Sequence, residues 1–234
     1  VPGLYSDISS VEIDTYLAET AAALTVEHPD YSYLAARIKV NSLHKETPGF
    51  IIATKNLYDD GLLREDYYKK VMENADLIES VIDYDKDYTF DYFALTTLIR
   101  AYLLKFDNKT IERPQDLWMR VTLTVTGNEF NLDKIKETYK SLSTGMYTHA
   151  TPTLFNSGLK MQQLSSCFLI GMEDDSIEGI FNTIKDCALI SKTAGGIGMH
   201  AHNIRGSGSR IKSTNGKSNG LIPFLKIFNE TAKS

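Results

Sequence analysis

The sequence has few cysteines and no long apolar run. Its only cysteines are Cys167 and Cys187, among 234 residues, which is too few for a disulfide-stabilised secreted scaffold. No apolar run approaches the ~20 residues that a membrane-spanning helix requires. The start, Val1-Pro2-Gly3, has neither a basic segment nor an initiator methionine, so no signal peptide is predicted. We therefore expect a cytoplasmic protein that does not bind a membrane.

The chain also lacks an excess of positive charge, because its formal net charge is −5. Nonspecific nucleic-acid binding usually needs a basic surface, so no nucleic-acid partner is predicted. The cations are unevenly distributed, however. The stretch from Lys192 to Lys233 contains seven lysines or arginines and one acid, Glu230. A local positive region of this kind can receive phosphate groups.

Apolar periodicity predicts a helical amino-terminal part. Ser9 or Ser10 can cap the first helix, and Pro114 near the start of a later helix fits because proline costs least there. A tight turn between two short strands is expected at 106–109. Helices are predicted over 9–27, 30–45, 56–81, 90–104, from Arg113-Pro114-Gln115 onward, and over 132–142.

The pattern changes after Thr148, where glycine and proline separate short apolar runs. A short buried strand is predicted at 167–170 and a second strand at 197–202. Strand, helix, strand at this spacing is a βαβ unit, typical of a parallel sheet or barrel. Asp175-Ser176 caps the intervening helix, with these apolar residues expected to face inward: Ile177, Ile180, Phe181, Ile184, Cys187 and Ile190. The fold class is thus a mainly α region followed by the opening of an α/β domain.

Cys167 lies between small polar residues and an apolar run. A redox thiol needs access and a partner thiol, and Ser165 and Ser166 offer hydroxyls for a polar substrate. A buried structural cysteine is the alternative, since free cysteine is among the most buried residue types. The local sequence leaves both readings open, and nothing favours or rules out a disulfide with Cys187.

The glycine-rich stretch 195–220 is a candidate phosphate-binding segment. Glycine lets backbone N–H groups approach an anion closely, although a solvated loop is the alternative. The P-loop pattern fails because Ile211 stands where its leading glycine belongs, and Gly195-Gly196-Ile197-Gly198 ends a helix instead of opening one. The charged residues of this region are Lys192, Arg205, Arg210, Lys212 and Lys217.

No metal site is predicted. His200 and His202 share a strand face but have no acid or cysteine cluster nearby. The aspartates of 83–87 lack the glycine and terminal glutamate of a calcium loop, so a capped, hydrogen-bonded loop is expected there.

An ordered set of short patches resembles the large (α) subunit of class I ribonucleoside-diphosphate reductase, eukaryotic type, in its amino-terminal portion. The resemblance implies the start of that family's ten-stranded α/β barrel over 149–234, a helical domain over 49–148 and a remnant of the ATP-cone over 1–48. The patches are Gly3–Ser6, Ala18–Ala22, His28–Tyr31, Leu34–Ile38, Leu43–Thr47, Glu112–Gln115, Thr148–Asn156 and Gln163–Leu169, with the later Asp174–Gly179, Ser191–Gly198 and Thr214–Gly220.

The resemblance implies specific roles around the cysteine. Cys167 corresponds to one of the two thiols that reduce the ribose: a thiyl radical removes the 3′ hydrogen, the pair helps expel the 2′ hydroxyl as water, and the pair becomes a disulfide. Thr151, which replaces a more common serine, Ser166 and Gly196 match positions that contact the ribonucleoside diphosphate.

The resemblance also implies two allosteric sites for ATP or deoxynucleoside triphosphates, with Mg²⁺ accompanying them. Ser10, Asp14 and Lys45 match the later half of the ATP-cone, whose earlier half is absent from this sequence. The specificity effector, bound at a homodimer interface in the family, matches Asp175, Ser176, Ile177, Lys192, Arg205, Lys212 and Ser213.

Further partners follow from the resemblance. They are a separate small (β) subunit that supplies the radical, and thioredoxin or glutaredoxin as reductant; the chain itself is expected to bind no cofactor and no metal. The family's radical cysteine and partner thiol match positions beyond Ser234, so we expect these residues alone to be inactive. The alternatives are a noncatalytic nucleotide-binding or interaction module of the same ancestry and, less favoured, a P-loop-like phosphotransferase.

Overall fold

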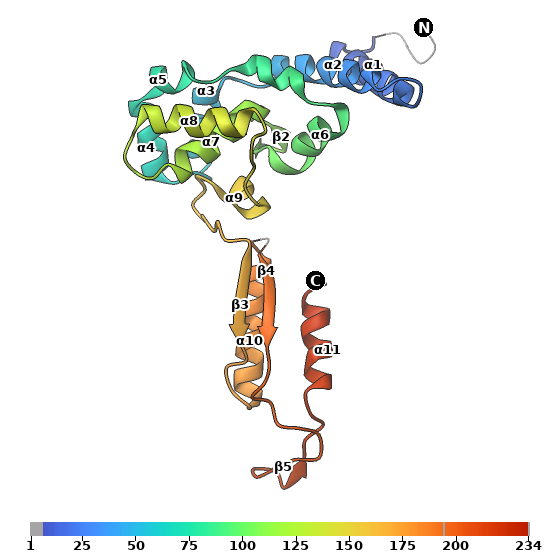
Figure 1. Ribbon diagram of the computed structural model, residues 1–234, viewed down its shortest axis with the longest axis vertical. Helices are drawn as coiled ribbons and strands as arrows, with labels where there is room; N and C mark the ends of the chain where they lie inside the picture. Colours follow the sequence, from blue (N-terminus) through green and yellow to red (C-terminus); the bar gives the residue numbers. More distant parts are fainter. Residues whose placement is uncertain (1–6, 194, 234) are drawn as a thin grey trace. The chain divides into compact units, whose positions relative to one another are not determined.

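The computed structural model of the chain describes residues 7–193 and 195–233 (Figure 1). The chain divides into two compact units, Val1–His149 with Leu154–Gln162, and Ala150–Thr153 with Gln163–Ser234. The patch Gly3–Ser6 lies outside the described residues. Within those residues, no helix is both long enough and apolar enough to cross a membrane. The three-part division expected from the sequence stays a prediction.

The first unit is helical, apart from a small hairpin of β1 (Lys105–Phe106) and β2 (Lys109–Thr110). The hairpin turn uses Asp107 and Asn108, both with positive φ, as expected for a two-residue turn. The helices are α1 (Ser10–Ala23), η1 (Leu24–Val26), α2 (Asp30–Glu46), α3 (Phe50–Asp59), α4 (Glu65–Glu73), α5 (Ala75–Glu79), η2 (Tyr84–Thr89), α6 (Tyr92–Thr97), η3 (Leu98–Tyr102), α7 (Pro114–Val125) and α8 (Leu132–Ser143).

Most predicted helices are confirmed, and local chemistry explains their ends. The Ser9 side chain accepts a hydrogen bond from the Glu12 N–H while the Glu12 carboxylate accepts one from the Ser9 N–H, a capping box that starts α1. Pro114 occupies the first turn of α7, as predicted. The Asp83 side chain accepts from the Asp85 N–H, so the aspartate-rich segment is a capped loop.

The single helix predicted over 56–81 is wrong, because the structure divides this segment among α3, α4 and α5. Gly61 follows α3 with φ of 80°, a left-handed conformation that ends a helix readily. Asn74 separates α4 from α5, and its side chain donates to the Lys70 carbonyl at 2.9 Å. Polar periodicity alone did not reveal these two breaks.

The core of the first unit forms around α7, in which ten of twelve residues are buried. Leu57, Ile78 and Ile135 from the surrounding helices, and Leu63 from the segment between α3 and α4, belong to the same apolar cluster. This helix therefore fixes the position of the elements that pack on it.

The second unit contains a pair of parallel strands connected by one helix. The helix α9 (Thr151–Asn156), which the sequence did not predict, is divided between the units, because its residues up to Thr153 belong to the second unit and those from Leu154 to the first. The other elements are β3 (Cys167–Gly171), α10 (Ile177–Ser191), β4 (Gly196–His200), β5 (Arg210–Ile211), β6 (Gly216–Lys217) and α11 (Ile222–Thr231).

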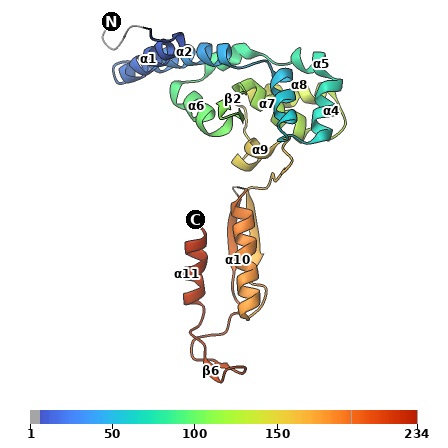
Figure 2. The same cartoon turned by 180° about the vertical axis from the view of Figure 1, so that it is seen from behind.

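The predicted βαβ unit is confirmed. β3 and β4 are parallel, with Cys167 opposite Gly196 and Gly171 opposite His200. Figures 1 and 2 show α10 against one face of the two strands. The described strands form no closed barrel, and the arrangement is an open sheet of the kind expected at the start of one. β5 and β6 form a separate antiparallel hairpin.

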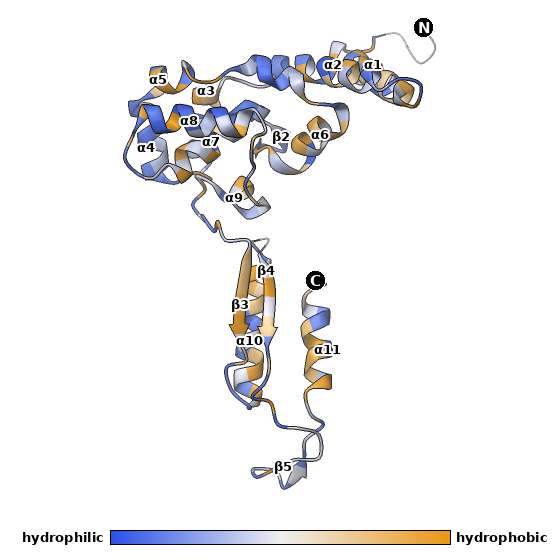
Figure 3. Cartoon of the chain, viewed as in Figure 1, coloured by the Kyte–Doolittle hydropathy of each residue, from blue (hydrophilic) through white to orange (hydrophobic). Residues whose placement is uncertain are grey.

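Two burial predictions for this unit are wrong. β3 is not buried, because its side chains alternate between exposed and partly buried, and Leu169 is 93% exposed. Figure 3 shows β3 as an apolar strand. On α10, Ile180 and Cys187 are buried as predicted, but Ile177 and Phe181 are exposed. Only one face of the helix meets the strand pair, so Ile177 and Phe181 lie outside that contact.

Candidate functional site

Cys167, the predicted catalytic thiol, is exposed at the start of β3, next to two of the predicted substrate-binding residues. The Gly196 N–H donates to the Ser166 carbonyl at 2.7 Å, and the Ser166 hydroxyl lies 3.7 Å from the Cys167 sulfur. A side chain on Gly196 would meet that carbonyl at 3.3 Å and the sulfur at 3.9 Å. Glycine therefore lets β4 begin close to the thiol. Thr151, the first residue of α9, belongs to the same compact unit.

The other end of the strand pair carries a cationic cavity of about 710 Å³. This size is within the range of small-molecule sites. Its lining includes six of the seven predicted effector residues: Asp175, Ser176, Ile177, Arg205, Lys212 and Ser213.

An ion pair shapes this cavity. The Arg205 Nε donates to the Asp175 carboxylate at 2.6 Å, and its Nη2 donates to the Asp175 carbonyl at 2.9 Å. Ser176 caps α10 by accepting from the Gly179 N–H at 3.0 Å. The helix amino terminus, with its partial positive charge, thus opens next to Arg205 and Lys212, which suits a polyphosphate.

Comparisons with known proteins place the chain in a family. The family description "Ribonucleotide reductase, all-alpha domain" matches residues 88–162, and "Ribonucleotide reductase, barrel domain" matches 165–234. The chain is 47% identical, over all of its length, to the ribonucleoside-diphosphate reductase large chain 2 of Saccharomyces cerevisiae. It is 46% identical over 99% of its length to the large subunit of Arabidopsis thaliana.

The chain belongs to the ribonucleotide reductase large-subunit family. Its resemblance and fold class, predicted from the sequence, are both confirmed. It spans only 28% of the yeast relative and 29% of the Arabidopsis relative.

Lys192, the seventh predicted effector residue, is not among the residues that line the cavity. It follows the last residue of α10, whereas Ser176 precedes the first. The two lie on either side of the fifteen helical residues, and sixteen steps of 1.5 Å separate them by roughly 24 Å. The structure therefore does not bring Lys192 to the cavity of its own chain.

The three predicted ATP-cone residues lie on the α1–α2 hairpin. The Lys45 Nζ is 3.2 Å from the Asp14 carboxylate, so the structure brings these two together. Ser10 is exposed at the first turn of α1, four residues before Asp14 and hence on the same side of the helix.

The remaining candidates from the sequence are the possible cysteine pair and the two histidines of 200–202. Both cysteines are free thiols, and burial raises the pKa of the Cys187 thiol. The rings of His200 and His202 stack with centroids 4.2 Å apart. In the part of the chain that the structure describes, no group of three or more histidines, cysteines or acids is placed to hold a metal ion.

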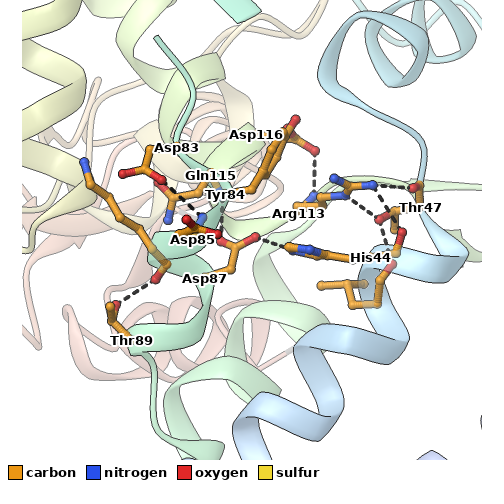
Figure 4. Close-up of polar contacts among 12 residues, drawn as sticks. His44, Thr47, Asp83, Tyr84, Asp85, Asp87, Thr89, Arg113, Gln115 and Asp116 are labelled. Carbon is orange, nitrogen blue, oxygen red and sulfur yellow. Dashed lines mark hydrogen bonds and ion pairs between the residues drawn. The ribbon is translucent and has the colours of Figure 1, made fainter. Parts of the chain in front are cut away.

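Sequence reasoning missed a buried polar network at the amino terminus of α7 (Figure 4). The Asp116 carboxylate, fully buried, accepts from the Tyr84 hydroxyl at 2.6 Å and from the Arg113 N–H at 2.8 Å. The Asp87 carboxylate, also fully buried, accepts from the Gln115 N–H and contacts the His44 ring. Aspartate rarely occupies such positions unpaired, so only the fold could reveal this cluster. The sequence signal was limited to Arg113-Pro114 and the aspartates of 83–87.

Proposed function

We propose that this chain supplies the substrate-reducing and effector-binding segments of a ribonucleoside-diphosphate reductase large subunit. The single observation that carries the proposal is the βαβ unit, which displays an exposed thiol at one end of β3 and a cationic cavity at the other. Family membership supports the same reading.

In this proposal Cys167 is one of two reducing thiols. The pair gives up two electrons and two protons as it forms a disulfide, and the ribose loses its 2′ hydroxyl as water. Ser166, Gly196 and Thr151 hold the substrate's diphosphate and ribose. Cys187 is a poor second thiol, because it is buried and burial raises its pKa. The second thiol and the radical cysteine are therefore expected in other parts of the subunit, with the radical supplied by a small subunit.

The cavity beside α10 is proposed to bind the deoxynucleoside triphosphate or ATP that sets substrate specificity. Arg205 and Lys212 face the phosphates together with the N–H groups at the start of α10. Since Lys192 lies roughly 24 Å from Ser176 along α10, a second copy of the chain is the source of that cation, which agrees with an effector site at a homodimer interface.

One experiment tests the assignment in a large subunit that contains this chain, assayed with its small subunit. Cys167→Ser should abolish turnover with thioredoxin or glutaredoxin while dTTP binding stays within twofold of the unmodified subunit. Cys187→Ala is the matched control and should retain turnover. Normal turnover in Cys167→Ser would overturn the role of the thiol. A subunit that binds dTTP but shows no turnover even unmodified would favour the noncatalytic module.

A further inference from the structure

The side chain of Gln163 holds the backbone of Ser165, two residues before the predicted reducing thiol Cys167. The Gln163 Nε2 donates to the Ser165 carbonyl at 2.9 Å, and its Oε1 accepts a hydrogen bond from the Ser165 N–H. One side-chain amide thus engages both backbone polar groups of a single residue. Since the N–H only donates and the carbonyl only accepts, the two contacts also fix which end of the amide carries the oxygen.

The same amide reaches the turn between α10 and β4. The Gln163 Nε2 also donates to the Thr193 hydroxyl at 3.3 Å, and that hydroxyl donates to the Ile190 carbonyl at 2.9 Å, in the last turn of α10. An amide nitrogen has two hydrogens, so it can serve the Ser165 carbonyl and the Thr193 hydroxyl together. Gln163 therefore joins the segment before the thiol to the turn that leads into Gly196.

A third segment is attached one residue further on. The Leu164 carbonyl accepts from the Thr153 hydroxyl at 3.1 Å, and Thr153 lies in the first turn of α9. Residues 163–165 thus contact α9, the start of β3 and the turn before β4, all within the second compact unit. These three segments carry the predicted catalytic and substrate-binding residues Thr151, Ser166, Cys167 and Gly196.

The backbone that Gln163 holds has no other regular support. Residues 162–165 belong to no helix or strand, and Ser165, Ser166 and Cys167 are all exposed. The ladder between β3 and β4 begins only at Cys167, opposite Gly196. Exposed backbone outside regular structure moves easily unless other groups hold it. The partly buried Gln163 side chain supplies that hold just before the thiol.

We propose that Gln163 is a positioning residue for the reduction of the ribose, with Thr193 as its partner. The amide sets the path of Ser165 and so places the Cys167 sulfur and the Ser166 hydroxyl against the substrate, which neither partner touches. The inference rests on the proposed function, because the position of Cys167 affects turnover only if this thiol reduces the substrate. Displacing a reacting group by about 1 Å can slow a reaction by ~100-fold.

Gln163→Met tests the proposal in a large subunit that contains this chain, assayed with its small subunit and a ribonucleoside diphosphate. Methionine has a similar length but cannot replace the three hydrogen bonds of the amide. We expect kcat to fall by about 10- to 100-fold, because the thiol is no longer held in place. KM should rise by less than about threefold, since Thr151 and Gly196 still hold the substrate.

The matched control is Gln162→Met, the same change one residue earlier. The Gln162 Oε1 accepts from the Gly158 N–H at 3.2 Å, so this variant also loses a side-chain hydrogen bond, but not one to the thiol segment. Its kcat should stay within about twofold of the unmodified subunit. An equal fall of kcat in both variants would show a general structural effect and overturn the proposal.

Substitutions of Thr193 test the second half of the contact. Thr193→Val removes the hydroxyl with little change of shape and should lower kcat, whereas Thr193→Ser keeps the hydroxyl and should restore most of the rate. Because both positions share one contact, adding Thr193→Val to Gln163→Met should cost less than it does alone. Equal rates in Thr193→Ser and Thr193→Val would overturn the partnership. Should Gln163→Met not fold, the two Thr193 variants decide.

Amide hydrogen exchange gives a readout that does not depend on turnover. Exchange of residues 165–167 should become about fivefold faster in Gln163→Met and stay unchanged in Gln162→Met, with residues 177–188 of α10 unaffected in both. If Cys167→Ser loses turnover while Gln163→Met keeps normal kcat, the positioning role is wrong and the proposed function stands. If Cys167→Ser keeps turnover, the proposed function is wrong, and unchanged exchange in Gln163→Met would then overturn the hold on Ser165 as well.

Discussion

Replacing Asp116 by asparagine should remove a large pH dependence from the stability of the first unit. Asp116 lies in the first turn of α7 and is completely buried. Burial is the main cause that raises the pKa of its carboxyl to about 7, from an ordinary value of 3.8, and the Tyr84 hydrogen bond opposes the rise. Asparagine can accept from the Arg113 N–H and donate to the Tyr84 oxygen, so the local contacts can survive the change.

The sign follows from proton counting. Between pH 3.8 and about 7 the folded chain keeps a proton on Asp116 that the unfolded chain has lost. The contribution of Asp116 to stability is therefore greatest at low pH and declines as the pH rises towards 7. At ~1.4 kcal/mol per pH unit, this decline amounts to ~2 to 3 kcal/mol between pH 5 and pH 7.5.

The assay uses the only tryptophan of the sequence, Trp118, which is buried in the same helix. Urea unfolding followed by its fluorescence gives the free energy of unfolding at each pH. Compared with the unmodified chain, Asp116→Asn should gain ~2 to 3 kcal/mol in relative stability from pH 5 to pH 7.5. Asp133→Asn, at an exposed first-turn position of α8, is the control and should show no such trend. An unchanged pH profile in Asp116→Asn would refute the reasoning.

Two further substitutions test packing in each unit. Glu112→Gln breaks a buried ion pair with Arg120, whose Nε lies 2.5 Å from the carboxylate, and should destabilise the first unit by ~3 to 5 kcal/mol in the same fluorescence assay. Glu65→Gln, at an exposed ion pair, should change little, and equal effects would contradict the burial argument. Gly179→Ala should destabilise α10 by ~1 to 3 kcal/mol despite alanine's helix propensity, because the added carbon would lie 2.7 Å from a backbone nitrogen. Gly171→Ala is the control, because a Cβ there would meet no atom within 4 Å, and it should be nearly neutral. The readout is amide hydrogen exchange across α10, which should become faster in Gly179→Ala and stay unchanged in Gly171→Ala.

Local signals in the sequence were sufficient where the structure depends on neighbours along the chain. Ser9 and Ser176 cap α1 and α10, and the βαβ unit follows from apolar runs of the right length. The break at Gly61 was missed because an isolated glycine inside a helical pattern is tolerated at a modest cost and does not by itself mark the end of a helix.

Burial was harder to predict, because it depends on partners far away in sequence. An apolar run such as 167–171 predicts a strand. Whether Leu169 is buried or exposed, however, depends on which other elements pack against that strand, and here it is exposed. Conversely, Asp87 and Asp116 are polar in any sequence pattern, and their burial follows from packing α2, η2 and α7 together. The resemblance named six residues of the proposed effector site, whereas only the fold showed that they line one cavity.

The far end of α7 is held by a lysine, which complements the carboxylates at its start. The Lys70 Nζ donates to the carbonyls of Leu123 and Gly127, both at 2.5 Å, and burial lowers the pKa of this ammonium group. Its neighbour Lys69 is instead 63% exposed and paired only with a surface glutamate. Two adjacent amines thus differ in access, because Lys69 is open to an acylating reagent whereas the Lys70 amine is engaged by two carbonyls until the end of α7 comes apart. The lowered pKa of Lys70 by itself favours the reactive neutral amine, so these contacts and not its charge protect it. The chain carries its own chemical reporter of the integrity of its central helix.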